Sequence, residues 1–153
     1  MANWKEIESA APEFADRVRG IFEAGTNKTL ATLRADGSPR ISASECKFEG
    51  GEVTLGMMEE SRKLQDVRRD PRFALHSPTL EPPPPDSDEP WIGDAKMSGR
   101  LVEIEPPADP VAGAGYFRLD ITEVALTYLG VPKDHLVIES WHPGVGWQRR
   151  TRK

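Results

Sequence analysis

The sequence has little that would tie it to an oxidising compartment or to a membrane. It contains a single cysteine, Cys46, among 153 residues, so an intramolecular disulfide is excluded. No apolar run approaches the ~20 residues that a membrane-spanning helix needs. The N-terminal stretch also lacks the apolar centre of a signal peptide. We therefore expect a cytoplasmic protein that is not embedded in a membrane.

An excess of positive charge is also missing. The formal net charge is −5 at pH 7, which argues against a general partner of nucleic acids or of anionic membranes. Basic side chains are nevertheless concentrated in residues 61–72, a contrast that favours a local anion site. The cations there are Arg62, Lys63, Arg68, Arg69 and Arg72, and the acids are Asp66 and Asp70.

This basic stretch predicts a helix that begins at a phosphate-binding position. Ser61 is a preferred N-cap residue, and Pro71 ends the helix because it cannot continue the backbone hydrogen bonds. Unpaired N–H groups and the positive end of the helix dipole then lie beside the side chains of Arg62 and Lys63. Cations in a first turn oppose the dipole, and a bound phosphate would explain them. The alternative is an ordinary solvated helix start.

Most of the remaining chain alternates with the two-residue period of strands. A helix is expected over residues 12–24, with Trp4 and Ile7 in a preceding turn. Hairpin signals such as Asp36-Gly37 predict antiparallel pairing, and closure into a small barrel leaves no long exposed edge. The sequence thus predicts one domain over residues 1–153, mainly β, with six to seven strands, an N-terminal helix and a short helix between the third and fourth strands. The seven strand candidates are residues 30–34, 40–44, 52–57, 72–76, 95–104, 116–128 and 136–141.

Several segments depart from the strand pattern. Residues 77–91 are rich in proline and acids, which predicts an exposed loop, with a partner-contacting arm as the alternative. Residues 48–51 are expected as a turn. Gly99 inside a strand indicates a bulge or a close approach. The apolar positions change parity near Thr122-Glu123, which indicates a bulge or bend there.

Taken in order, these segments resemble the flavin-binding split β-barrel family typified by pyridoxamine 5′-phosphate oxidase. The resemblance rests on Arg40-Ile41-Ser42 in a strand, Gly56-Met57 at a strand end, and the run from Ser61-Arg62-Lys63 to Asp70-Pro71-Arg72. It implies an antiparallel split β-barrel that binds FMN or the deazaflavin coenzyme F-420. It also implies a homodimer whose interface completes each cofactor site, and a small-molecule substrate.

The resemblance further implies which residues hold the cofactor. Arg40 and the Ser61-Arg62-Lys63 run would bind the phosphate, while Gly56-Met57 would line the flavin ring. Ser42 shares a strand face with Arg40, and solvent is the alternative occupant of that face. Trp147 is a further candidate, with burial in a core or interface as its alternative. No catalytic residue is identified, and Cys46 and the three histidines match no metal-ligand spacing.

Several residues differ from those that are common in pyridoxamine 5′-phosphate oxidase, and these differences change the activity that we expect. Glu45 stands where the oxidase commonly has a lysine, and Asp94 where it has a glutamine near the flavin. Trp147 and Arg149 replace an arginine and a histidine that contact its substrate. We therefore expect no true pyridoxamine phosphate oxidase but an oxidoreductase that uses FMN or F-420 on a conjugated or aromatic substrate. The alternative is a non-catalytic flavin carrier or a protein-interaction member. The basic tail that starts at Arg149 is either solvated or reaches an anionic cofactor tail across the dimer.

Overall fold

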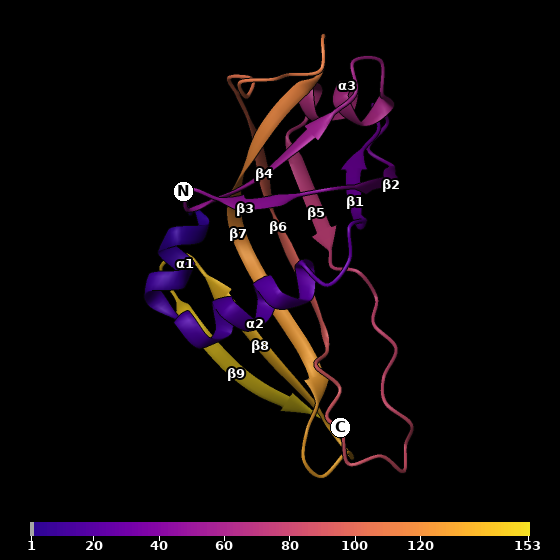
Figure 1. Cartoon of the computed structure of the whole chain (residues 1–153), viewed down its shortest axis with the longest axis vertical. Coiled ribbons are helices and arrows are strands. Elements are labelled where there is room, and N and C mark those ends of the chain that lie inside the picture. Colours follow the sequence, from indigo (N-terminus) through magenta and orange to yellow (C-terminus); the bar gives the residue numbers. More distant parts are fainter. Residues whose placement is uncertain (1) are drawn as a thin grey trace.

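The computed structural model describes residues 2–153, which form a nine-stranded antiparallel sheet and three helices (Figure 1). The sheet order is β2-β1-β5-β6-β7-β4-β3, and β8 and β9 extend it from β7. The expected mainly-β fold with few helices is confirmed. The helices are α1 (Trp4–Ala10), α2 (Pro12–Phe22) and α3 (Arg62–Arg69). The strands are β1 (Lys28–Leu33), β2 (Pro39–Ser44), β3 (Lys47–Glu49), β4 (Glu52–Met57), β5 (Arg72–His76), β6 (Asp94–Ile104), β7 (Gly115–Leu129), β8 (Leu136–His142) and β9 (Gly146–Arg152).

The long strand β7 divides the sheet into two parts. Its first residues, 115–118, pair with β4, and its last residues, 124–129, pair with β8. In Figure 1 the β8–β9 hairpin therefore lies at one end of β7, on the side where α1 and α2 pack, while β3, β4 and α3 lie toward the other end. This split separates the C-terminal hairpin from the basic helix start within one chain.

Helix α1 adds a short element that the sequence analysis had placed in a turn. The Asn3 side chain accepts a hydrogen bond from the N–H of Glu6 and caps the helix, and both Trp4 and Ile7 are fully buried. The Trp4 ring packs edge-on against Phe48, with 4.9 Å between ring centroids. Seven residues are too few for helical periodicity to be visible, and burial of the two apolar side chains stabilises the helix instead.

Strands β3 and β9 are likewise additions to the seven expected strands. Residues 47–49 pair with β4, opposite Val53, and bury Phe48 between two exposed side chains. Three residues cannot show an alternating pattern. The residues from Arg149 onward were expected as a basic tail. Residues 146–152 instead form β9, which pairs with β8 along its whole length although its side chains are mostly exposed. Backbone pairing, not burial, defines this strand.

The bulge expected near Thr122 is present. Ser98 pairs with Glu123 and Gly99 pairs with Ile121, so Thr122 is the extra residue. Gly99 makes the close approach that the sequence indicated: a Cβ at this position would lie 2.0 Å from the carbonyl oxygen of Asp120.

The proline-rich connection between β5 and β6 contains no helix or strand, as expected (Figure 1). Its ends are nevertheless held. The Trp91 indole donates to the carbonyl of Leu80 at 3.3 Å, and the Lys133 ammonium donates to the carbonyls of Ser87 and Glu89 at 2.8 and 3.3 Å. The loop is therefore tied to the segment that joins β7 to β8.

Candidate functional site

The start of α3 has the features expected of an anion-binding helix terminus. Ser61 is the N-cap, and its Oγ accepts a hydrogen bond from the N–H of Leu64 at 3.3 Å. The first turn carries no acidic side chain, and Arg62 is exposed and makes no hydrogen bond or ion pair within residues 2–153. Unpaired backbone N–H groups and an unneutralised guanidinium thus face outward together.

Lys63 joins this helix start to strand β2. Its Nζ donates a hydrogen bond to the carbonyl oxygen of Ala43 at 2.8 Å. Partial burial disfavours the ammonium and lowers the pKa of Lys63. One carbonyl leaves two of the three ammonium protons for another acceptor, so Lys63 remains able to bind an anion beside Ala43.

Arg40 approaches the same helix from β2 through an ion pair with Asp66. The Arg40 Nε lies 2.7 Å from Asp66 Oδ2, an oxygen that also accepts from the Thr32 hydroxyl at 2.8 Å. The other Asp66 oxygen accepts from Arg69 at 3.3 Å. Burial alone would raise the pKa of Asp66, but the hydrogen bonds from Arg40, Thr32 and Arg69 outweigh it and lower that pKa. Asp66 is therefore a charged carboxylate held by three donors.

Ser42 supplies an unused hydroxyl next to these cations. It lies two residues after Arg40 on β2, which places both side chains on one strand face. Its Oγ is buried and has no hydrogen-bond partner among residues 2–153. A buried hydroxyl without a partner is unfavourable, so a ligand group at this point would satisfy it.

Gly56 and Met57, the residues expected to line the flavin ring, differ in which of their atoms a ligand can reach. The side chain of Met57 belongs to the hydrophobic core, so only its backbone is available to a ligand. Gly56 is exposed and pairs with Tyr116 across β4 and β7; a Cβ on Gly56 would approach the Tyr116 ring to 3.1 Å. The absence of a side chain at Gly56 thus lets the Tyr116 ring pack closely against β4.

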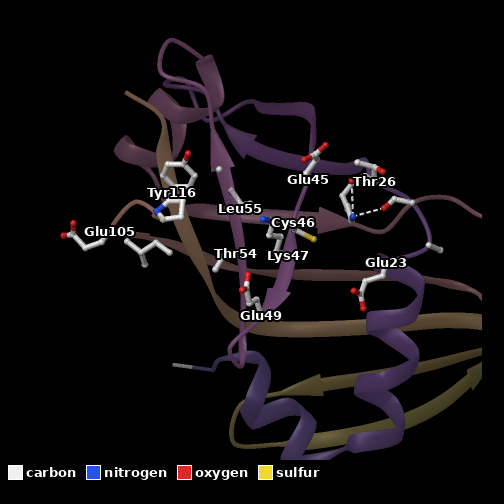
Figure 2. Close-up of a pocket in the computed structure, with 16 residues that line it drawn as sticks. Glu23, Thr26, Glu45, Cys46, Lys47, Glu49, Thr54, Leu55, Glu105 and Tyr116 are labelled. Carbon is white, nitrogen blue, oxygen red and sulfur yellow. Dashed lines mark hydrogen bonds between the residues drawn. The ribbon is translucent and has the colours of Figure 1, made fainter. Parts of the chain in front are cut away.

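Gly56 borders a cavity with a volume of about 710 Å³ (Figure 2). This size lies within the range of small-molecule and cofactor sites. Figure 2 shows carboxylates of four glutamates around the cavity, with Cys46, Lys47 and Leu55 between them. The lining residues are Glu23, Ala24, Gly25, Thr26, Lys28, Glu45, Cys46, Lys47, Glu49, Thr54, Leu55, Gly56, Ile104, Glu105, Pro107 and Tyr116.

The cavity contains no activated nucleophile. Burial raises the pKa of the Cys46 thiol to about 11, so the thiol is protonated at neutral pH. The Lys28 ammonium is occupied by the carbonyls of Gly25 and Thr26, at 2.8 and 3.0 Å. Neither Cys46 nor Lys28 is thus activated as a nucleophile.

Trp147 lies away from the other candidates within the chain. Its indole Nε1 donates to Glu139 Oε1 at 2.9 Å, and the other Glu139 oxygen accepts from Arg17 at 2.8 Å and from the Tyr128 hydroxyl. This cluster joins α2 to β7, β8 and β9, whereas α3 lies toward the opposite end of the molecule (Figure 1). The structure thus joins β2, which carries Arg40 and Ser42, to α3, which begins after Ser61 with Arg62 and Lys63, through the Arg40–Asp66 and Lys63–Ala43 contacts. Gly56 and Met57 lie on β4, and Trp147 lies apart on β9.

Two further properties of residues 2–153 concern metal ligands and membrane-spanning helices. No group of three or more His, Cys, Asp or Glu side chains in this range is arranged to hold a metal ion. None of the helices described is both long and apolar enough to cross a bilayer.

Comparison with known proteins gives similarity in structure only. No protein-family model and no curated protein matches the sequence. A pyridoxamine 5′-phosphate oxidase-related, FMN-binding protein from Nostoc punctiforme superposes with a TM-score of 0.63 at 15% identity, covering 100% of this chain and 98% of that one. PhzG from Burkholderia lata, solved with tetrahydrophenazine-1-carboxylic acid, gives a TM-score of 0.62 at 12% identity over 95% of this chain and 89% of its own. An F-420 reductase gives 0.52 at 16% identity over 69% and 94%.

These neighbours share the strand arrangement described above, over nearly the whole chain in two cases. Their sequence identities are too low to carry more than the fold. The chain therefore has the split β-barrel fold of pyridoxamine 5′-phosphate oxidase-like proteins.

Proposed function

We propose that the protein is an oxidoreductase that binds FMN or the deazaflavin coenzyme F-420, with the cofactor phosphate at the junction of β2 and α3. The observation that carries this proposal is the double link between β2 and α3: Lys63 in the first turn of the helix donates to Ala43, and Arg40 on the strand pairs with Asp66. Fold neighbours named as an FMN-binding protein and an F-420 reductase support it.

The residues at this junction fit a phosphate. Arg40, Arg62 and Lys63 offset its negative charge, the N–H groups of the first helical turn donate to its oxygens, and Ser42 Oγ gains the partner that it lacks. When bound, either cofactor supplies hydride transfer. The chain contributes anchoring of the phosphate at one end, and the 710 Å³ cavity bordered by Gly56 and Tyr116 provides space for a planar ring and a substrate.

We further propose that two copies form a homodimer that completes each site. Trp147, which is half-exposed and far from α3 in its own chain, would then face the site of the partner copy. A dimer would also cover apolar surface on β2, where Ile41 is 73% exposed. Mass measurement in solution tests this point: a monomer at micromolar concentration contradicts it.

The first experiment is fluorescence titration of the purified protein with FMN and with F-420. Saturable binding of one of them supports the proposal and selects the cofactor, and absence of binding to both overturns it. The Lys63→Ala variant should weaken binding about tenfold or more, because it removes a charge-assisted contact. The control is Lys5→Ala, an exposed lysine of α1, which should leave the affinity within twofold.

A second measurement separates an enzyme from a carrier. The reduced cofactor is mixed with the protein and a panel of enones and quinones, and oxidation of the cofactor is followed by absorbance. Turnover above the rate without protein supports the oxidoreductase. Tight binding without turnover of any panel member indicates the carrier instead.

A further inference from the structure

We propose that Asp66 is a positioning residue that orients Arg40 toward the cofactor phosphate. This inference rests on the proposed function, since it concerns the same site. Asp66 itself does not face the anion; it lies behind Arg40, on the buried side of α3.

Hydrogen bonds from Thr32 and Arg69, in addition to the one from Arg40, hold the Asp66 carboxylate in place. The carboxylate side chain is only 4% exposed, and it accepts from Arg40 and Thr32 on one oxygen and from Arg69 on the other. Thr32 and Arg40 are directly opposite each other in the β1–β2 pair. Two neighbouring strands and the helix thus meet at one carboxylate, which leaves its oxygens little freedom.

The contact also determines which edge of Arg40 remains available. Asp66 binds the Nε, and neither Nη group of Arg40 makes a hydrogen bond within residues 2–153. The Arg40 side chain is 24% exposed. A guanidinium held at Nε presents its two Nη groups as a planar fork, the geometry that binds two phosphate oxygens at once.

Asp66 acts together with Lys63 to align the two halves of the site. Lys63 links the first turn of α3 to Ala43, and Asp66 links the middle of the same helix to Arg40, three residues earlier on β2. With both links in place, the distance between the backbone N–H groups at the start of α3 and the Nη groups of Arg40 is fixed. Loss of the Asp66 link would free Arg40 to adopt other rotamers in solvent.

The test compares cofactors with and without the phosphate. Dissociation constants are measured for FMN and riboflavin, or for F-420 and its phosphate-free deazaflavin riboside, in the wild type and in Asp66→Asn. We expect the variant to weaken binding of the phosphorylated form about tenfold, the scale typical of residues that orient a ligand-binding group. Affinity for the phosphate-free form should stay within twofold. Asp70, which has a side chain 29% exposed and pairs with Arg72 at the end of the same helix, provides the control Asp70→Asn, with both affinities unchanged.

A double variant shows whether Asp66 acts through Arg40. In an Arg40→Ala background, Asp66→Asn should cause no further loss of FMN affinity. An equal loss in both backgrounds, or an equal loss for FMN and riboflavin, would overturn the positioning role. If Asp66→Asn does not fold, Thr32→Val removes a donor to the same oxygen and should weaken FMN binding alone, by a few fold; an unchanged FMN affinity in that variant would also overturn it.

A probe without a flavin separates this inference from the proposed function. Inorganic phosphate is titrated into the labelled protein while the NMR signal of the Arg40 Nε–H is followed. A shift in the wild type that is weakened in Asp66→Asn supports the positioning role even if no flavin binds. If the Arg40 signal does not respond to phosphate in the wild type and no flavin binds, both proposals fail.

Discussion

Trp147 on β9 and Glu139 on β8 are joined by a hydrogen bond of 2.9 Å from the indole Nε1 to the carboxylate Oε1. Glu139 is almost fully buried, and its second oxygen accepts from both Arg17 and Tyr128. The Arg17 guanidinium also lies over the Tyr128 ring, 4.5 Å from its centroid. One carboxylate therefore connects α2, β7, β8 and β9.

Replacement of this carboxylate should destabilise the fold. We expect Glu139→Gln to lower the free energy of unfolding by about 2 kcal/mol, because the amide cannot accept from all three donors and leaves a buried group unpaired. Urea unfolding followed by circular dichroism measures the change. Glu123→Gln, at a more exposed pair with His142, is the control and should change stability by less than about 0.5 kcal/mol. Equal effects of the two substitutions would contradict the role of Glu139.

The stabilisation by Glu139 should depend on pH with a defined sign. Burial alone would raise the pKa of Glu139, but hydrogen bonds from Tyr128, Trp147 and Arg17 outweigh it, so the folded-state pKa lies below the ordinary 4.5. A lowered pKa gives stability that is present above the unfolded pKa and is lost as the pH falls through the folded value. The stability difference between wild type and Glu139→Gln should thus be constant from pH 7 to about 5 and shrink below pH 4.5. A difference that grows on acidification would be inconsistent with this account.

Cys46 should be unreactive in the folded protein. Burial raises the pKa of its thiol to about 11, so less than one part in a thousand is thiolate at pH 7.5. Modification by iodoacetamide at that pH should be at least about 100 times slower in buffer than in 8 M urea, where the thiol returns to its ordinary pKa near 8.5. Mass spectrometry of timed samples gives both rates. Comparable rates would show that the thiol is accessible and ionised.

Two glycine substitutions should act in opposite directions. Gly99→Ala places a Cβ against the Asp120 carbonyl oxygen at the bulge and should destabilise by about 2–4 kcal/mol. Gly20→Ala, inside α2, meets no atom within 4 Å and should stabilise by about 0.5–1 kcal/mol through helix propensity. Thermal unfolding of both variants checks the pair. A neutral Gly99→Ala would mean that the bulge relaxes.

Residue patterns were sufficient for the longer helix α2 and for the strands in which buried and exposed side chains alternate. The helix at α2, the strand at β6 and the bulge at Thr122 follow from periodicity and from its interruption. Strand β9 was not recognisable because an arginine-rich, exposed segment has no burial pattern, and its pairing is visible only from the backbone. The turn at Gly144, next to Pro143, was the available signal.

The site was predictable in part. Ser61 at a helix start and the cations next to it are typical of a phosphate-binding site, which the sequence alone indicates. The proximity of this helix start to β2 was implied only by the resemblance. In the sequence Asp66 is only an acidic residue among arginines. A helical pattern does not show that Arg40 and Thr32, which lie 26 and 34 residues earlier in the chain, donate hydrogen bonds to it from two strands. The unpartnered Ser42 hydroxyl is also a property of packing, which composition cannot indicate.

The unpaired edge of β9 has a consequence for how copies of the chain can meet. Within residues 2–153 this strand pairs with β8 alone, and it carries Arg149, Arg150 and Arg152. If two such edges joined in antiparallel register, arginines would lie opposite arginines, and their repulsion would prevent growth of a continuous intermolecular sheet. A strand rich in aspartate or glutamate would meet this edge without that repulsion. We therefore expect the arginines of β9 to disfavour edge-to-edge association of two copies through this strand.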